Sequence, residues 1–407
     1  MLEPYYNAND RITGVAGLAG DPAYPPKQPQ MPPIPLGRSG ALMAKAFNTL
    51  GWHWWPSDCA INTVPYEGRD KCLNLGACCS GCSQGAKAST DITYWPLAQR
   101  AGVELRTRCR VREITVGRDG MATGVIYYDA DGHEHWQAAE VVVLACNGIG
   151  TPRLLLNSRS SAFPDGLANS SGLVGKNLMF HPYVAIEGVF TEPLDGARGP
   201  HKSISSHQFC NSDPARGFVR GFSFEMHRGR GPVNTIARAL LSSQLPWGEA
   251  HHAAARERID RITGVIAVCE DLPELSNCVT LDPVLKDSHG IPAPKVNYRL
   301  SANSLRMMDF AVRRGEEVMR AAGAREIEVE SPMPYAGWHL MGTARMGHDP
   351  SASVTNEWGR CHDVRNLFII DGSLFVTSAA VNPTSTIQAL ALYVADSIKK
   401  RLDNLFD

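Results

Sequence analysis

The chain has 407 residues, of which 43% are hydrophobic and 20% are charged, and its formal net charge at pH 7 is −1. This composition supports a large buried core and excludes a disordered chain. The near-zero charge argues against a nucleic-acid-binding surface, and no apolar run reaches the roughly 20 residues that a membrane-spanning helix requires.

Loops dominate the first quarter of the chain. Residues 20–37 are rich in proline and show no periodicity, which predicts an extended surface connection. Residues 38–50 are expected to form a short helix, and residues 66–87 a loop rich in glycine and cysteine.

The stretch from residue 91 to residue 158 is more regular. Gly102 follows a predicted helix as its C-cap, and the alternation of apolar and polar residues after position 110 predicts an antiparallel meander. The continuous apolar run "VVVLAC" then predicts a strand that is buried on both faces. A helix should follow, with Thr151 as its N-cap and Pro152 in its first position.

The second half of the chain divides into two parts. Residues 160–335 contain short strand-like runs and one amphipathic helix over 303–323, which predicts a second, sheet-containing domain. Beyond it, "NLFIID" predicts a buried strand that closes at Asp371, and a helix is expected from Pro383 with Asn382 as its cap. Two buried strands that each lead through a glycine turn into a helix are typical of half a doubly wound nucleotide-binding domain. The G-x-G-x-x-G pattern that normally opens such a domain does not occur in these 407 residues.

Two features near the C-terminus could carry chemistry. The first turn of the helix at Pro383 offers free N–H groups and the hydroxyl of Thr384, which could stabilise an anion such as a reduced flavin. A purely structural helix start would give the same pattern. His339 stands in "WHLMGTARMG", where a histidine could accept a hydroxyl proton, or could be a core histidine bonded to a backbone carbonyl. Taken singly, each feature favours the structural interpretation.

Taken together, the motifs resemble a known family. "WHLMGTARMG" and "NLFIIDGSLFVTSAAVNPTSTIQALALYVADSI" resemble the C-terminal signature of the glucose–methanol–choline (GMC) family of flavin oxidoreductases. The stretches "GCSQGAKAS", "RVREITV", "VVVLACNGIGTPRLLLNS" and "GLVGKNLMFHP" fit the same family in order. The resemblance covers nearly the whole chain and is thinnest over 185–330, where the substrate domain of the family varies.

The resemblance implies an FAD-dependent enzyme that oxidises a small-molecule alcohol to a carbonyl compound. His339 matches the base that accepts the O–H proton, while the carbon-bound hydrogen leaves as a hydride to the flavin. Asn382 matches the residue that hydrogen-bonds the substrate oxygen and orients it. For Val111 an ordinary strand valine is the competing interpretation. The residues expected to contact FAD are Val111, Asn147, Gly148, Asp371, Gly372, Asn382, Pro383 and Thr384.

The expected fold class is mixed α/β. A partial Rossmann-like FAD-binding domain would comprise residues 1–182 and 336–407, and a substrate-binding domain with an antiparallel or mixed sheet would comprise 183–335. The opening "LEPYYNANDRITGV" resembles a family segment that lies downstream of the G-x-G-x-x-G unit, so the N-terminal portion is expected to be missing. The isolated chain is then expected to be unstable or flavin-free. A catalytically inactive fragment, or a partial subunit of such an enzyme, is the alternative hypothesis.

The cysteine loop is expected to hold no metal. Its spacing, C-x5-C-C-x2-C, matches neither a zinc knuckle nor a common ferredoxin pattern, although an iron–sulfur cluster is the alternative. A metal site at His348 is a weaker alternative, because "GHDP" is typical of a solvated turn. The four cysteines are Cys72, Cys78, Cys79 and Cys82.

The alcohol, the electron acceptor and the oligomeric state are left open, and a cytoplasmic location is only the default expectation.

Overall fold

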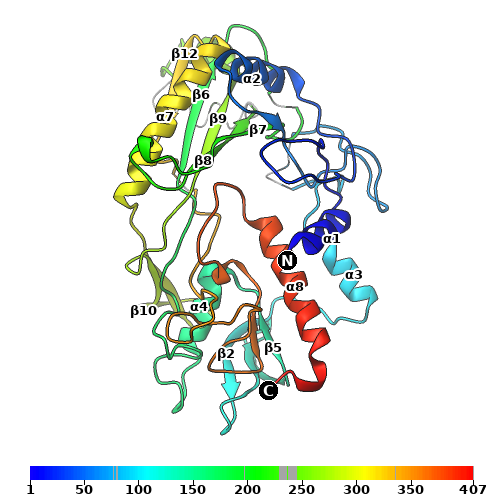
Figure 1. The fold of residues 1–407 in the computed structure, drawn as a ribbon, viewed down its shortest axis with the longest axis vertical. Coiled ribbons are helices and arrows are strands. Elements are labelled where there is room, and N and C mark those ends of the chain that lie inside the picture. The colour runs from blue at the N-terminus through cyan, green and yellow to red at the C-terminus, as the bar shows by residue number, and fades with distance from the viewer. Residues whose placement is uncertain are drawn as a thin grey trace.

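The computed structural model describes residues 1–76, 78, 81–196, 198–228, 236, 245–334 and 336–406. Figure 1 shows two bodies arranged along the long axis of the molecule. The upper body is built on a six-stranded sheet, and the lower body on a pair of parallel strands with helices around them.

The upper body is an antiparallel sheet that helices cover on one face. In spatial order its strands are β1 (Trp55–Pro56), β7 (Ile204–Phe209), β8 (Phe222–His227), β9 (Ile262–Cys269), β6 (Tyr183–Val189) and β12 (Glu326–Glu330). α7 (Ala302–Ala322) packs on β6 and β9 and also contacts α2 (Gly37–Leu50). The buried core between helices and sheet contains Phe47, Phe222 and Phe224. Because successive strand residues point to opposite faces, Ser223 and Glu225 lie on the other face of the sheet.

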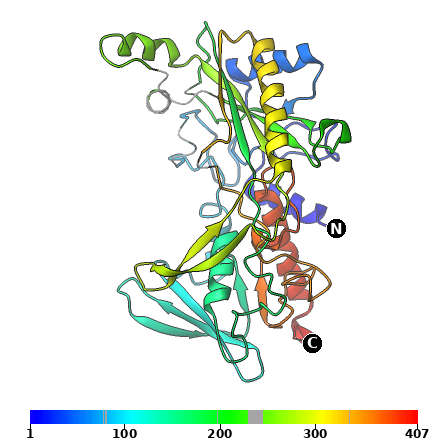
Figure 2. The ribbon, with the colours of Figure 1, turned by 90° about the vertical axis from the view of Figure 1, so that its left-hand side faces the viewer.

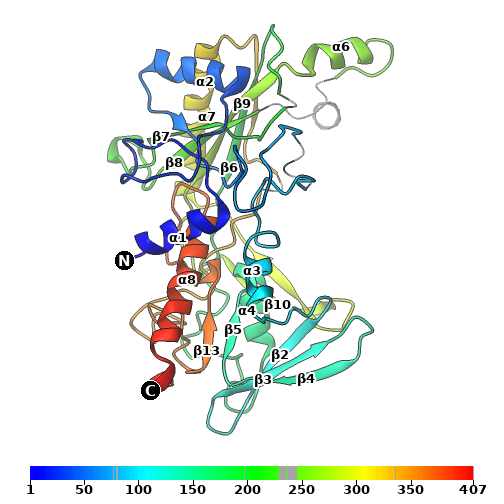
Figure 3. The same cartoon turned by 90° about the vertical axis from the view of Figure 1, so that its right-hand side faces the viewer.

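The lower body contains a short parallel sheet in which β5 (Val142–Leu144) pairs with β13 (Leu367–Ile369). β5 leads into α4 (Asn147–Asn157), and β13 leads through η2 (Gly372–Leu374) and a loop into α8 (Thr384–Lys400). Figure 3 shows α1 (Glu3–Thr13) against α8, where the Tyr5 hydroxyl donates to Asp396 at 2.6 Å.

The remaining elements surround this core. Figure 2 shows the β10–β11 hairpin beside α4, and Arg153 of α4 reaches across to Asp287 at 2.9 Å. Within the described residues, no helix is both long enough and apolar enough to cross a membrane. These elements are β2 (Arg110–Val116), β3 (Ala122–Tyr128), β4 (Glu134–Ala138), β10 (Cys278–Lys286), β11 (Pro292–Asn297), α3 (Tyr94–Arg100), α6 (His251–Arg258), η1 (Pro214–Arg216) and η3 (Leu402–Asn404).

The architecture confirms the mixed α/β class, the helix near 38–50, the meander and the long helix near 303–323. β13 is buried throughout, as predicted. The prediction for "VVVLAC" was wrong in one respect, because Val143 is 44% exposed and β5 is therefore not buried on both faces.

The packing also crosses the predicted domain boundaries. α2 and β1 precede residue 182, yet they belong to the core and the sheet of the upper body. The β10–β11 hairpin falls within 183–335 but packs on α4 of the lower body. The two bodies are thus each assembled from separate parts of the chain.

α4 begins about one turn earlier than predicted. Its first residue is Asn147, whose side-chain oxygen accepts from the N–H groups of Ile149 and Gly150 at 3.0 and 3.2 Å. Thr151 therefore lies inside the helix and is not its cap. The prediction was wrong because the Asn-Gly pair, with Asn147 in the left-handed region at φ 67°, already starts the helix.

Pro152 consequently lies in the interior of α4, where it cannot donate to the carbonyl of Gly148. That carbonyl oxygen instead accepts from the Thr343 hydroxyl at 2.7 Å. The missing backbone hydrogen bond is thus replaced by one that ties α4 to the segment following His339.

Candidate active site

Two glycines seat the backbone that carries His339. A Cβ atom on Gly372 would lie 2.5 Å from the carbonyl oxygen of Leu340, and one on Gly148 would lie 2.7 Å from its carbonyl carbon. Both distances are shorter than real Cβ contacts, so only glycine allows these backbone segments to approach so closely. Contact of Gly148 and Gly372 with FAD stays a prediction, while the structure shows that they position the residue next to His339.

A pair of histidines fixes the hydrogen on His339. His181 Nε2 contacts the carbonyl oxygen of Ala379, which can only accept, so Nε2 carries the hydrogen. His181 Nδ1 therefore has a free lone pair, and it lies 2.6 Å from His339 Nδ1, which must donate to it. The Tyr183 oxygen, 3.1 Å from the same His339 atom, is a second acceptor. His339 Nε2 is then left without a hydrogen and is the atom that can accept a proton.

Burial keeps both histidines neutral. It lowers the pKa of His339 to about 4, while Glu225 acts to raise that pKa and Lys202 to lower it. Burial also lowers the pKa of His181 to about 3, and its neighbour His339 adds to the effect. At pH 7 His339 is therefore a neutral imidazole with a lone pair at Nε2, which is the form a general base requires.

The loop that leads into α8 extends from the lower body toward the sheet of the upper body (Figure 1). Ala379 accepts from His181, and the next carbonyl, that of Ala380, accepts from the Ser223 hydroxyl at 2.6 Å. Asn382 follows with an exposed side chain. The loop thus joins the histidine pair, strand β8 and the start of α8, although the described residues show no direct contact between Asn382 and His339.

Asn382 does not cap α8, so that prediction was wrong. Pro383 occupies the N-cap position with helical backbone angles, φ −83° and ψ −7°, and among the described residues no side chain bonds the first N–H groups of the helix. Thr384 begins the helix and is exposed. These free N–H groups, next to exposed amide and hydroxyl side chains, suit the pyrimidine end of a flavin, whose negative charge appears on reduction. The donor set present here therefore fits the cofactor that the sequence implies.

Asp371 has a structural role at the end of β13. One carboxylate oxygen accepts from the Ser373 N–H at 2.8 Å and its hydroxyl at 2.6 Å. The other accepts from the Asn147 N–H at 3.0 Å and the Thr151 hydroxyl at 2.5 Å. Asp371 thereby joins β13 to the first turn of α4. Contact of Asp371 and Asn147 with FAD stays a prediction.

Val111 belongs to a different part of the lower body. It lies in β2 of the meander, is 37% exposed and pairs with Tyr127 of β3. The structure therefore brings His339, Gly148 and Gly372 together around Leu340, and leaves Val111 on a separate sheet.

His181 and Tyr183 were not predicted as site residues. His181 lies within "GLVGKNLMFHP", a stretch that resembles the GMC family, and Tyr183 follows it directly, so the motif indicated their approximate place. It did not give their role, because His181 meets His339 from 158 positions away in the chain.

An ion pair on the sheet face opposite α7 was also not predicted. Glu225 of β8 lies 2.6 Å from the ammonium of Lys202, and their side chains are 17% and 29% exposed. No motif marks either residue, because both fall in 185–330, the stretch where family resemblance is weakest.

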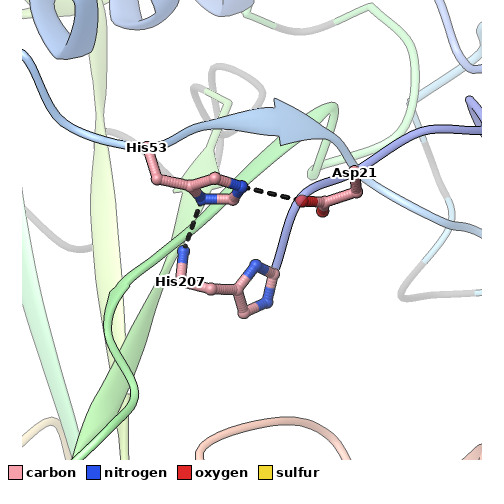
Figure 4. Close-up of side chains that lie close together, drawn as sticks. All are labelled: Asp21, His53 and His207. Atoms are coloured by element: carbon pink, nitrogen blue, oxygen red, sulfur yellow. Dashed lines mark hydrogen bonds and ion pairs between the residues drawn. The ribbon is translucent and has the colours of Figure 1, made fainter. Parts of the chain in front are cut away.

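Near this ion pair lies a cluster of two histidines and an aspartate, shown in Figure 4. Potential ligand atoms of Asp21, His53 and His207 all lie within 4.8 Å of one another. His53 Nδ1, however, accepts from the His207 N–H at 3.0 Å, so its Nε2 carries the hydrogen that points to Asp21 at 2.8 Å. A metal ion at Nε2 would displace this hydrogen and leave neither ring nitrogen of His53 protonated, which is an imidazolate anion. Through these hydrogen bonds the cluster instead links the proline-rich connection, residues 20–37, to strand β7.

The cysteine loop is only partly described, because Cys79 lies outside the described residues. Cys72, Cys78 and Cys82 are half-buried. Within the described part of the chain, none of them belongs to a group of three ligand residues close enough to share a metal ion.

Comparison with known families gives two matches, both described as GMC oxidoreductase. One covers residues 43–183 and the other residues 273–391, so together they span most of the chain. They include β5, the histidine pair and the start of α8.

Two relatives align over almost the entire chain. A 2-methyl-1,2-propanediol dehydrogenase from Mycolicibacterium austroafricanum is 44% identical over 412 residues, covering 100% of this chain and 74% of the relative. The large subunit of a fructose dehydrogenase from Gluconobacter japonicus is 30% identical, covering 98% of this chain and 73% of the relative.

Solved structures show the same fold. A formate oxidase from Aspergillus oryzae, whose structure addresses FAD modification, superposes with a TM-score of 0.63 and 15% identity. The superposition covers 100% of this chain and 78% of that chain. At this identity the likeness shows the fold alone.

Proposed function

The chain belongs to the GMC family of oxidoreductases, and on that basis we propose that it uses FAD and His339 to oxidise a primary hydroxyl group of a small, neutral polyol. Oxidation of CH–OH groups follows from the family and its named relatives. These relatives favour an enzyme over the inactive-fragment alternative. The diol as substrate class is taken from the 44% identical relative.

The observation that carries the proposal is the direction of the hydrogen bonds around His339, that is, which atoms donate and which accept. The Ala379 carbonyl fixes the hydrogen of His181, and His181 fixes the hydrogen of His339 on Nδ1. Nε2 of His339 is left to take the hydroxyl proton of the substrate. The burial that lowers the pKa of His339 keeps this atom unprotonated at neutral pH.

The other residues bind and orient. Asn382, exposed at the start of α8, would hydrogen-bond the substrate oxygen and hold it in line with His339. The free N–H groups at the start of α8 would hold the pyrimidine end of the flavin. The flavin, when bound, supplies the acceptor for the hydride that leaves the substrate carbon.

The test uses the purified chain supplied with FAD. Its flavin absorbance is followed anaerobically on addition of 2-methyl-1,2-propanediol, and turnover is measured with an artificial dye as electron acceptor. His339→Ala should slow flavin reduction by about 10²- to 10⁴-fold, the usual contribution of a general base, without loss of bound FAD.

His348→Ala is the matched control. His348 belongs to the same segment, but its side chain is 86% exposed and lies 3.5 Å from Glu357. It should react as the unmodified chain does. Turnover that survives in His339→Ala at near the original rate would disprove the assignment of the base.

A further inference from the structure

The sheet face opposite α7 extends from the histidine pair toward the Lys202–Glu225 pair. Tyr183, Val268 and Ser223 are direct neighbours across β6, β9 and β8. Glu225 stands two residues beyond Ser223 on the same face, because strand side chains alternate. With strands about 4.8 Å apart and about 7 Å per two residues, the Cα atoms of Tyr183 and Glu225 are about 12 Å apart. Both side chains project from this face. Between them Ser223 and Val268 are buried, and the Ser223 hydroxyl donates to the Ala380 carbonyl, so the pair lies beside the loop that also contacts His181.

The ion pair keeps unused hydrogen-bonding capacity. Glu225 Oε1 binds the Lys202 ammonium at 2.6 Å. Within the described residues, the second carboxylate oxygen of Glu225 and the other two ammonium hydrogens of Lys202 make no further hydrogen bond. Neither side chain is fully buried, at 17% and 29% exposure. The pair therefore offers one acceptor and two donors side by side.

This combination suits a hydroxyl group better than an ion. A hydroxyl donates one hydrogen and accepts another, whereas a charged group would meet a like charge on one member of the pair. Asp58 is a further acidic neighbour, and its charge acts to raise the pKa of Lys202. Three other titratable neighbours carry no charge at pH 7. Burial raises the pKa of Cys59 to about 11 and lowers that of His207 to about 4, so both stay neutral. Burial also raises the pKa of Tyr24 above its usual range, which leaves it neutral too.

The pair also bears on His339 itself. Glu225 and Lys202 both act on the pKa of His339, in opposite directions. A partly buried ion pair adds little net stability to a fold, because the cost of removing both charges from water offsets their mutual attraction. Its place beside the base therefore points to a role in binding.

We propose that the Lys202–Glu225 pair binds a hydroxyl group next to the reacting carbon and so selects neutral vicinal diols and polyols over simple alcohols. Glu225 accepts from this second hydroxyl and Lys202 donates to it, while the first hydroxyl faces His339. The inference rests on the proposed function, in which His339 is the base.

The test compares two alcohols that differ by one hydroxyl group, 2-methyl-1,2-propanediol and 2-methyl-1-propanol. In Glu225→Gln, which keeps the shape of the side chain, kcat/KM for the diol should fall about 10-fold, while the value for the simple alcohol changes less than 2-fold. The control is Glu328→Gln on the edge strand β12. Glu328 is 13% exposed and pairs with Arg258, and its substitution should leave the ratio of the two substrates unchanged.

Binding is measured separately, as the rise in melting temperature that each alcohol produces. The diol should stabilise the unmodified chain more than the simple alcohol does, and Glu225→Gln should lose that difference. This measurement decides the inference even if neither alcohol is oxidised, in which case the proposed function alone fails. Equal losses for both alcohols in Glu225→Gln, or no loss for either, would overturn the inference.

Discussion

His339 and Glu225, a charged group that acts on the pKa of His339, belong to two regions whose local structure is set in different ways. His339 lies on irregular backbone that is fixed by two glycines, by the Thr343 hydroxyl and by His181. Glu225 lies on a regular strand, and the alternation of β8 and the ion pair with Lys202 set its direction. We call these the backbone-built side, residues 338–343 and 371–384, and the sheet-built side, strands β6 to β9.

The difference indicates a division of labour. The backbone-built side cannot change without moving the base, so it should affect every substrate equally. A side chain on the sheet-built side can be exchanged while the strand stays in register, so it should affect the choice of substrate. The following three predictions test this division, beginning with the largest expected effect.

Gly372→Ala should lower kcat about 100-fold for the diol and the simple alcohol alike. The new Cβ would lie 2.5 Å from the Leu340 carbonyl oxygen, so the backbone beside His339 must shift. A displacement of about 1 Å at a catalytic group costs rate by that order. Steady-state rates with both alcohols, together with FAD content, provide the measurement.

Gly337→Ala is the matched control, two residues before His339. A Cβ there would lie 3.5 Å from the Phe180 ring, which is an ordinary contact. It should keep most of the activity. Equal losses in the two variants would mean that the effect comes from general loosening and not from the close approach at Leu340.

The same division explains what the sequence could predict. His339 and the start of α8 were predicted as site residues because backbone-built sites need particular residues at fixed spacing, and such spacing can be read as a motif. The cap at Asn382 and the start of α4 were predicted wrongly, because each depends on local backbone angles that Pro383 and Asn147 set.

No comparable motif marks the residues of the sheet-built side. Lys202 stands two residues before β7 and meets Glu225 because β7 pairs with β8, and nothing in either segment alone marks them. The partnership of His181 with His339 was hidden for the same reason, since it forms only after two distant segments fold together. Long-range pairing is a tertiary property that a single sequence does not display.

The sheet-built side should also limit stability at alkaline pH, by about 2 kcal/mol between pH 5 and pH 8. Glu270, just beyond β9, is 7% exposed, and burial raises its pKa to about 7 from an ordinary value of 4.5. The folded state therefore holds a proton that the unfolded state releases. This stability is fully present below pH 4.5 and is lost as the pH rises through 7, at about 1.4 kcal/mol per unit of pKa shift.

Glu270→Gln should remove this loss, because the amide stays neutral. Denaturant unfolding at pH 5 and pH 8 measures it, with Glu316→Gln on the helix surface as the control. The stability difference between Glu270→Gln and the unmodified chain should grow with pH. If that difference is the same at both pH values, Glu270 is ionised in the folded state and the prediction is wrong.

The smallest expected effect concerns the histidine pair, and it tests how the base is held. His181→Leu removes the lone pair that accepts from His339 Nδ1, so the hydrogen of His339 can move to Nε2 and block the base. We expect kcat to fall about 10-fold for both alcohols, corresponding to about 1.4 kcal/mol. His181→Asn places an oxygen near the former Nδ1 position and should recover most of this loss. Because His181 is 1% exposed, melting temperatures must accompany the rates. If asparagine and leucine lower kcat equally while both proteins stay folded, His181 only fills space and the tautomer of His339 is set by Tyr183 instead.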